Sequence, residues 1–191
     1  MKVQITLLEE MLGTCSSDRD VHEKYIASKA PDAMSTEEEV AAIGVEATVE
    51  KGMTIFAREN DKPFIWNYMI KGFFKAAASA MNRVAGSETK KLSSIRKIID
   101  TSIAVTPRKI FLGDVVMGNC QRPLRIEFPE KVALANSETI PAGTSFVIEI
   151  AMLNPVWEKA VREWLNMGET YFGLGQWRNS GKGMFSWKEV K

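Results

Sequence analysis

Residues 145–187 read SFVIEIAMLNPVWEKAVREWLNMGETYFGLGQWRNSGKGMFSW and contain three patterns in succession. Residues 145–153 carry apolar side chains on both alternating faces, which is typical of a strand in the middle of a sheet. Asn154 and Pro155 then form the start of a helix, because apolar residues follow at helical spacing at Trp157, Ala160, Val161, Trp164 and Leu165. We expect this helix to end at Gly168 and a glycine-rich hairpin to follow it.

Four glycines frame the centre of that hairpin, namely Gly173, Gly175, Gly181 and Gly183. Glycine loses more entropy on folding than any other residue, so this spacing indicates positive φ angles or a close backbone approach. Trp177, Arg178 and Lys182 lie between them and offer a stacking face and cations, which suit a sugar-phosphate strand or a nucleobase. The alternative is a structural hairpin in which Trp177 and Trp187 cap the core.

The spacing of these glycines excludes two common nucleotide-binding loops. Five residues separate Gly175 from Gly181, where a Walker phosphate loop has four, and Gly183 stands where Ser or Thr would hold magnesium. Arg178 occupies the place of the third glycine of a dinucleotide fingerprint, which should also follow a strand and open a helix.

The N-terminal half combines a strand, an acidic insertion and a helix. Apolar and polar residues alternate over 2–8, which predicts a half-buried strand. Residues 13–63 are polar and acidic, with one helix-capping signal at 35–39, and we interpret them as an insertion. A helix is expected next, with an apolar stripe that starts near Trp66 and continues through Ile70, Phe73, Phe74, Ala77, Met81 and Val84. Gly72 within it indicates close backbone packing at that turn.

A second, shorter helix is expected after Ser87, which is a plausible N-cap. Its buried side would carry Leu92, Ile95 and Ile99, and its exposed side Lys90, Lys91, Arg96 and Lys97. Strands are expected at residues 103–112, 122–128 and 132–135, and a turn at 141–144. The sequence therefore predicts one α+β domain over residues 1–191, with helices on one face of an antiparallel sheet and a ferredoxin-like or RRM-like topology.

Composition places the chain among ordinary globular proteins. Its 191 residues are 45% hydrophobic and 26% charged, and no apolar run approaches the length of a membrane span. We expect a cytoplasmic protein without a membrane partner. Cys15, Cys120 and the single histidine, His22, fall in no metal-ligand spacing, so neither a metal site nor a cofactor is expected.

Charge is segregated along the chain although the formal net charge is only +1. Residues 16–62 contain eleven acids and six bases, whereas residues 83–110 contain seven bases and two acids. An acidic face and a basic face of this kind can meet head to tail between subunits, or the basic face can follow phosphates.

These segments, in this order, resemble the repeat-associated mysterious protein (RAMP) superfamily, and especially the backbone subunits of type III CRISPR effector complexes. Residues 70–72 are similar to the family's Lys-Gly helix opening, residues 138–146 (ETIPAGTSF) to its turn into a central strand, and residues 173–183 to its glycine-rich loop. Two features differ. Residues 66–69 (WNYM) replace the usual Pro-Gly-Ser run, and 13–63 lacks a counterpart of the thumb aspartate that cuts RNA. The chain is also similar to uncharacterised proteins of bacteriophages and prophages, which would place it in the cytoplasm of a bacterial host cell.

The resemblance implies an RNA-binding fold whose subunits often stack. We therefore expect a non-catalytic protein that binds RNA or single-stranded DNA and forms a head-to-tail homo-oligomer. Trp177 would stack on a base, since Trp66, Trp157 and Trp164 already have a place on apolar helical stripes. The candidate binding residues are Lys71, Lys90, Lys91, Arg96, Lys97, Gly173, Gly175, Trp177, Arg178, Gly181, Lys182 and Gly183.

Two other functions stay open. The first is a phage protein that binds another protein, or assembles, or counters host defence, with a purely structural glycine loop. Its support is the near-zero net charge and the expectation of exposed Met and Trp side chains. The second is metal-assisted phosphodiester cleavage, which would have to use some of Asp18, Asp20, Asp32 and Asp114.

Overall fold

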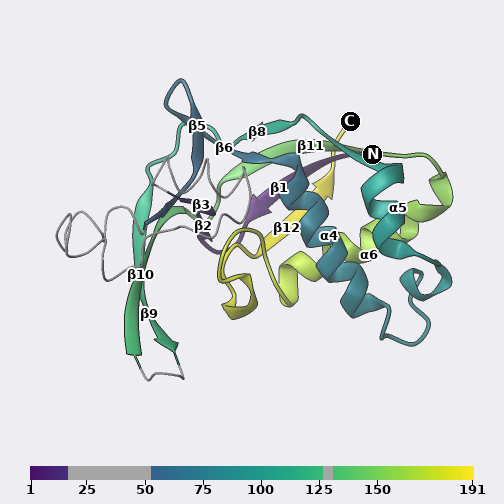
Figure 1. Cartoon of the computed structure of the whole chain (residues 1–191). Helices are drawn as coiled ribbons and strands as arrows, with labels where there is room; N and C mark the ends of the chain where they lie inside the picture. Colours follow the sequence, from purple (N-terminus) through teal and green to yellow (C-terminus); the bar gives the residue numbers. More distant parts are fainter. Residues whose placement is uncertain (17–52, 127–130) are drawn as a thin grey trace, which may run out of the picture.

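The computed structural model describes residues 1–16, 53–126 and 131–191 of the chain. Its main layer is a four-stranded antiparallel sheet in the order β12-β1-β11-β7. These strands are β1 (Lys2–Leu7), β7 (Ile103–Thr106), β11 (Ser145–Met152) and β12 (Phe185–Glu189). One face of the sheet is covered by three helices, α4 (Asn67–Met81), α5 (Ile95–Ser102) and α6 (Glu158–Thr170) (Figure 1). The expected α+β architecture is therefore present.

The sheet buries one face because its strands alternate in register. Ile5 of β1 lies opposite Phe146 of β11, Val3 lies opposite Ile148, and all four side chains belong to the core beneath the helices. β11 is an inner strand, as predicted, but its second apolar face is not buried, since Val147 is 41% exposed. The four-stranded sheet thus has one packed face and one open face.

Two smaller sheets extend from this layer. One contains β2 (Met11–Leu12), β3 (Cys15–Ser16), β4 (Thr54–Ile55), β9 (Gly118–Ile126) and β10 (Lys131–Ile140). The other contains β5 (Ala57–Glu59), β6 (Lys62–Trp66) and β8 (Lys109–Phe111). The ribbons of β9 and β10 run side by side away from the helical layer (Figure 1).

The predicted insertion, residues 13–63, is described only at its two ends. Those ends form β3, β4, β5 and the start of β6, none of which the sequence pattern indicated. The helix-capping signal at 35–39 lies outside the described residues, as do Asp18, Asp20, His22 and Asp32.

The helices follow the predicted periodicity, with four corrections. α4 ends at Met81, so Val84, which is 48% exposed, lies beyond the helix and outside the core. Gly72 does not mark close packing, because a Cβ built there would meet no atom within 4 Å. The second helix is divided into a 3₁₀ turn, Thr89–Lys91, and α5, although the Ser87 Oγ does accept the expected capping hydrogen bond from the Lys90 N–H at 3.1 Å. α6 continues past Gly168 to Thr170, so this glycine does not end the helix; it makes room for the Phe185 ring, which lies 2.3 Å from its Cβ position. Within the described ranges, no helix is both long and apolar enough to span a membrane.

Candidate nucleic-acid interface

The glycine-rich loop joins α6 to β12 and closes upon itself at its base. A Cβ on Gly173 would lie 2.0 Å from the carbonyl carbon of Gly183, and a Cβ on Gly183 would lie 2.0 Å from the carbonyl oxygen of Leu174. Gly175 and Gly181 have φ angles of +80° and +87°, which side chains rarely adopt. The protein's own backbone therefore requires these four glycines, whatever the loop binds.

Lys182 fastens the loop to the segment after β1. Its Nζ donates a hydrogen bond to Glu10 Oε1 at 2.5 Å, and the Gly183 N–H donates to the Glu10 carbonyl at 2.8 Å. The hydrogen bond that Lys182 donates to Glu10 raises the pKa of Lys182 above its usual value. The ammonium of Lys182 is thus already engaged within the protein.

Trp177 lies outside the hydrophobic core, with 44% of its surface exposed. The guanidinium carbon of Arg122, from β9, is 5.1 Å from the centroid of the Trp177 ring, which is within cation–π range. Arg122 also donates from Nη2 to Gln176 Oε1 at 2.9 Å, while its buried Nε and Nη1 have no hydrogen-bond partner among the residues that the structure describes. The sequence analysis missed Arg122, because a single base in a strand pattern carries no signal that it contacts a loop more than fifty residues away.

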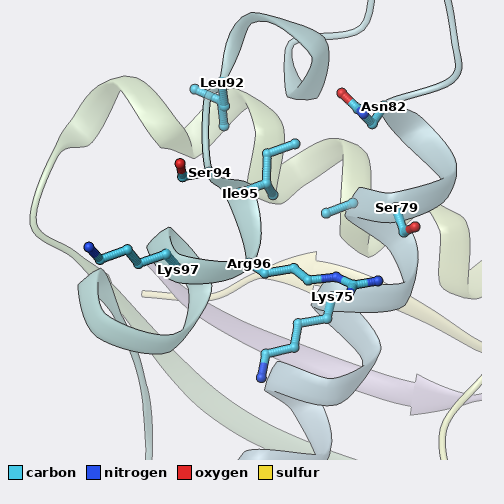
Figure 2. A pocket seen from close by; sticks show the side chains of 9 residues that line it. Lys75, Ser79, Asn82, Leu92, Ser94, Ile95, Arg96 and Lys97 are labelled. Atoms are coloured by element: carbon cyan, nitrogen blue, oxygen red, sulfur yellow. The ribbon is translucent and has the colours of Figure 1, made fainter.

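Arg178 takes part in a groove on the outer side of α4. The groove has a volume of about 580 Å³ and receives residues from α4, α5 and the glycine loop. Its lining consists of Gly72, Lys75, Ala76, Ser79, Ala80, Arg83, Arg96, Asp100 and Arg178. A second hollow of about 510 Å³, between α4 and α5, shares Lys75, Ser79 and Arg96 with it (Figure 2). We refer to the two hollows together as the α4 groove.

The α4 groove is basic. Lys75, Arg83, Arg96 and Arg178 contribute cations to the larger hollow, against one carboxylate, that of Asp100, which pairs with Lys75 Nζ at 2.6 Å. Figure 2 shows Arg96 reaching from α5 toward Ser79 on α4. Within the described part of the chain, neither Arg96 nor Arg178 takes part in an ion pair. As far as the described residues are concerned, both guanidinium groups are therefore open to an anion.

The structure brings together some of the predicted binding residues and separates others. Arg96 and Arg178 line the larger hollow, Lys97 lines the smaller one, and Lys71 donates from Nζ to the Asp100 carbonyl at 3.1 Å beside them. Lys90 and Lys91 lie on the 3₁₀ turn, outside the lining of either hollow, and Lys91 pairs with Glu88 at 2.7 Å.

Sequence reasoning missed two cations of the groove, Lys75 and Arg83. The signal was present, because Gly72, Lys75, Ala76, Ser79 and Ala80 recur at intervals of three and four opposite the apolar stripe of α4. The small residues on that face of α4 form the floor of the groove, and the side chains of Lys75 and Arg83 line it. Gly72, with open space where its Cβ would be, lies on the floor of this groove.

The open face of the four-stranded sheet offers a different surface. Its outward residues on β1, β11 and β12 include Lys2, Thr6, Ser145, Val147, Glu149 and Lys188. RRM domains stack bases on aromatic side chains of such a face. The described residues place no aromatic side chain there, so the α4 side is the better candidate.

In the described ranges, no three His, Cys, Asp or Glu residues lie close enough together to hold a metal ion. Asp114 lies 3.8 Å from Lys62 Nζ, and both side chains are largely exposed. Cys15 and Cys120 are free thiols, and burial raises the pKa of Cys15.

Comparison with known proteins identifies the fold through structure and not through sequence. No family model matches the chain, and no curated protein matches it. A chain of the type III-B Cmr-beta complex bound to cognate target RNA matches with a TM-score of 0.55 and 14% identity, over 100% of this chain and 58% of that one. The present chain therefore spans little more than half of that neighbour's length.

Two further structures are similar. A chain of a type IV-B CRISPR complex matches with a TM-score of 0.51 and 12% identity, over 98% of this chain and 88% of that one. Cmr6 from Pyrococcus furiosus matches with a TM-score of 0.48 and 11% identity, over 100% and 97% of the two chains. The likeness to the type III-B and type IV-B subunits supports a RAMP-like fold.

Proposed function

We propose that this chain is a non-catalytic protein that binds RNA or another single-stranded nucleic acid along the α4 groove. The observation that carries the proposal is the meeting of Arg83, Arg96 and Arg178, which come from three separate segments of the chain, around one groove with a single carboxylate. Clustered bases on one face are the electrostatic mark of a surface that follows phosphates.

The structural neighbours support the same class of ligand. One of them belongs to the type III-B Cmr-beta complex bound to cognate target RNA, and another belongs to a type IV-B CRISPR complex. The order β1, α4, β7, β11, α6, β12 along the chain, with the strand order β12-β1-β11-β7, supports a ferredoxin-like assignment for the main layer. An origin in bacteriophages rests on the sequence resemblance alone.

Each predicted residue has a role in this proposal. Arg96 and Arg178 contact phosphates, and Trp177 stacks on a base beside them. The four loop glycines hold the backbone that presents Trp177 and Arg178. Lys97 lines the smaller hollow itself, and a longer strand would reach Lys71, Lys90 and Lys91. Lys182 holds the loop in place through its contact with Glu10.

Ultraviolet crosslinking followed by mass spectrometry tests where the ligand lies. A uridine decamer should crosslink to peptides that contain residues 71–83, 95–100 or 176–179. Crosslinks confined to the open face of the sheet, at β1 or β11, would contradict the proposal. So would a complete lack of crosslinks at protein concentrations at which a known RNA-binding protein crosslinks efficiently.

The alternative function is binding to another protein. Exposed apolar side chains at Leu153 and Val156, which are 79% and 73% exposed after β11, favour it. Such a surface would bind independently of salt concentration, because apolar contacts do not release counterions. A gel shift of labelled RNA at increasing salt concentration therefore separates the two functions.

A further inference from the structure

A second group of side chains combines aromatic rings with cations at the N-terminal end of α4. Trp66 ends β6 and precedes α4, and Tyr68 lies in the first turn of the helix. Their rings are within 14° of parallel, with centroids 6.3 Å apart. The Arg108 guanidinium carbon lies 5.6 Å from the centroid of the Trp66 ring. We call Trp66, Tyr68 and Arg108 the aromatic platform.

The aromatic platform is supported from below and open above. Phe64 is 4% exposed and packs edge-on against Trp66, at 5.0 Å between centroids. The Lys109 ammonium, which pairs with Glu59, lies 6.0 Å from the Trp66 centroid. Trp66 is half-buried and lies outside the core cluster, so it is not the core residue that its place on an apolar stripe predicted. Tyr68 is 61% exposed. The large Tyr68 ring is held at the surface, and among the described residues it has no structural partner on its outer side.

The position of Tyr68 connects the platform to the α4 groove. Tyr68 precedes Gly72 by four residues, Lys75 by seven and Ser79 by eleven, so all four lie on one face of α4. At 1.5 Å per residue, Tyr68 lies roughly 16 Å along the helix axis from Ser79. A strand in the groove that continues toward the N-terminus of α4 therefore arrives at the ring.

We propose that the aromatic platform is a stacking site for a nucleobase of the single strand that lies in the α4 groove. This inference rests on the proposed function, because it concerns the same bound strand. Aromatic rings accept any base, since every base has a π-face, and cations beside the ring attract the neighbouring phosphates. Arg108 is exposed and has no ion-pair partner among the described residues, which favours an anionic strand over an apolar protein segment.

Fluorescence anisotropy of a labelled uridine decamer tests the platform. Tyr68→Ala should weaken binding by about tenfold, the loss expected for one stacked base, while the dependence on salt stays that of the wild type. Tyr68→Phe should restore the affinity, because it keeps the ring. Tyr171→Ala, which removes a tyrosine with a similar exposure of 66%, is the matched control and should bind like the wild type.

Four outcomes are decisive. The platform would be overturned, and the proposed function would stand, if Tyr68→Ala bound within twofold of the wild type while the double variant Arg96→Gln and Arg178→Gln lost much of its affinity. Failure of the wild type to bind the decamer would overturn both. If Tyr68→Ala lost self-association in light scattering but kept the RNA affinity of the wild type, the platform would be a protein contact instead. A tenfold loss that Tyr68→Phe restores, with the thermal midpoint unchanged, would support the platform.

Discussion

Trp177 combines a strained backbone conformation with an exposed ring. Its φ angle is +54°, a conformation that costs a residue with a Cβ about 1–2 kcal/mol. With tryptophan at this position, the protein is therefore less stable than it would be with glycine. The Arg122 guanidinium against its ring offsets part of that cost, since a cation–π contact contributes about 0.5–1 kcal/mol at an exposed site.

We predict that Trp177→Ala weakens RNA binding about tenfold and lowers the free energy of unfolding by no more than about 1 kcal/mol. The first effect is the loss of a stacked base, and the second is the loss of the contact with Arg122. Anisotropy and urea denaturation measure the two quantities. A loss of several kcal/mol with unchanged affinity per folded molecule would show that Trp177 is purely structural.

At the scale of elements, Gly72 and Gly168, which both lie within described helices, have opposite environments. Gly72 of α4 has open space where a Cβ would be, whereas at Gly168 of α6 a Cβ would lie 2.3 Å from the Phe185 ring. The first helix can therefore accept a side chain and the second cannot.

We predict that Gly72→Ala raises the free energy of unfolding by about 1 kcal/mol, because alanine is the better helix former. Gly168→Ala should lower it by about 1–3 kcal/mol, because the Phe185 ring must move. Urea denaturation of the two variants provides the comparison, and each variant is the other's control. Stabilisation by Gly168→Ala would mean that Phe185 does not pack on α6 as described.

Periodicity accounts for the elements that sequence analysis predicted. β1, β11, α4 and α6 each bury one regular face, and a regular face leaves a local pattern of apolar residues. The strands β2 to β5 have two or three residues each and leave no such pattern.

The candidate site was predicted only in part, for a different physical reason. Arg96 and Arg178 were identified as exposed bases, but their meeting with Lys75 and Arg83 depends on how α5 and the glycine loop pack beside α4. Arg122 meets Trp177 only because β9 passes the loop. Contacts of this kind depend on tertiary packing, and no local propensity encodes them.

At the scale of the whole molecule, segregated charge predicts association. Arg83, Arg96 and Lys97 of the basic segment 83–110 line the α4 groove, and the acidic residues of 16–62 lie mostly outside the described ranges. Complementary faces make heterologous contacts, which generate rings or filaments.

We therefore predict oligomers at low salt that dissociate as sodium chloride rises toward 1 M, because salt screens the attraction between exposed charges. Light scattering at several salt concentrations measures this association. A monomer at every concentration tested would rule the association out, and oligomers that persist unchanged at high salt would point to apolar contacts.

The central claim is that phosphates bind in the α4 groove, and the salt dependence of RNA affinity tests it most directly. For single strands, each phosphate contact contributes about 0.7 to the slope of log affinity against log salt concentration. Arg96→Gln combined with Arg178→Gln should therefore reduce the slope by about 1.4. Lys2→Gln combined with Lys188→Gln removes the same charge from the open face of the sheet and should leave the slope unchanged. Equal slopes for the two double variants, or a slope near zero for the wild type, would contradict the claim.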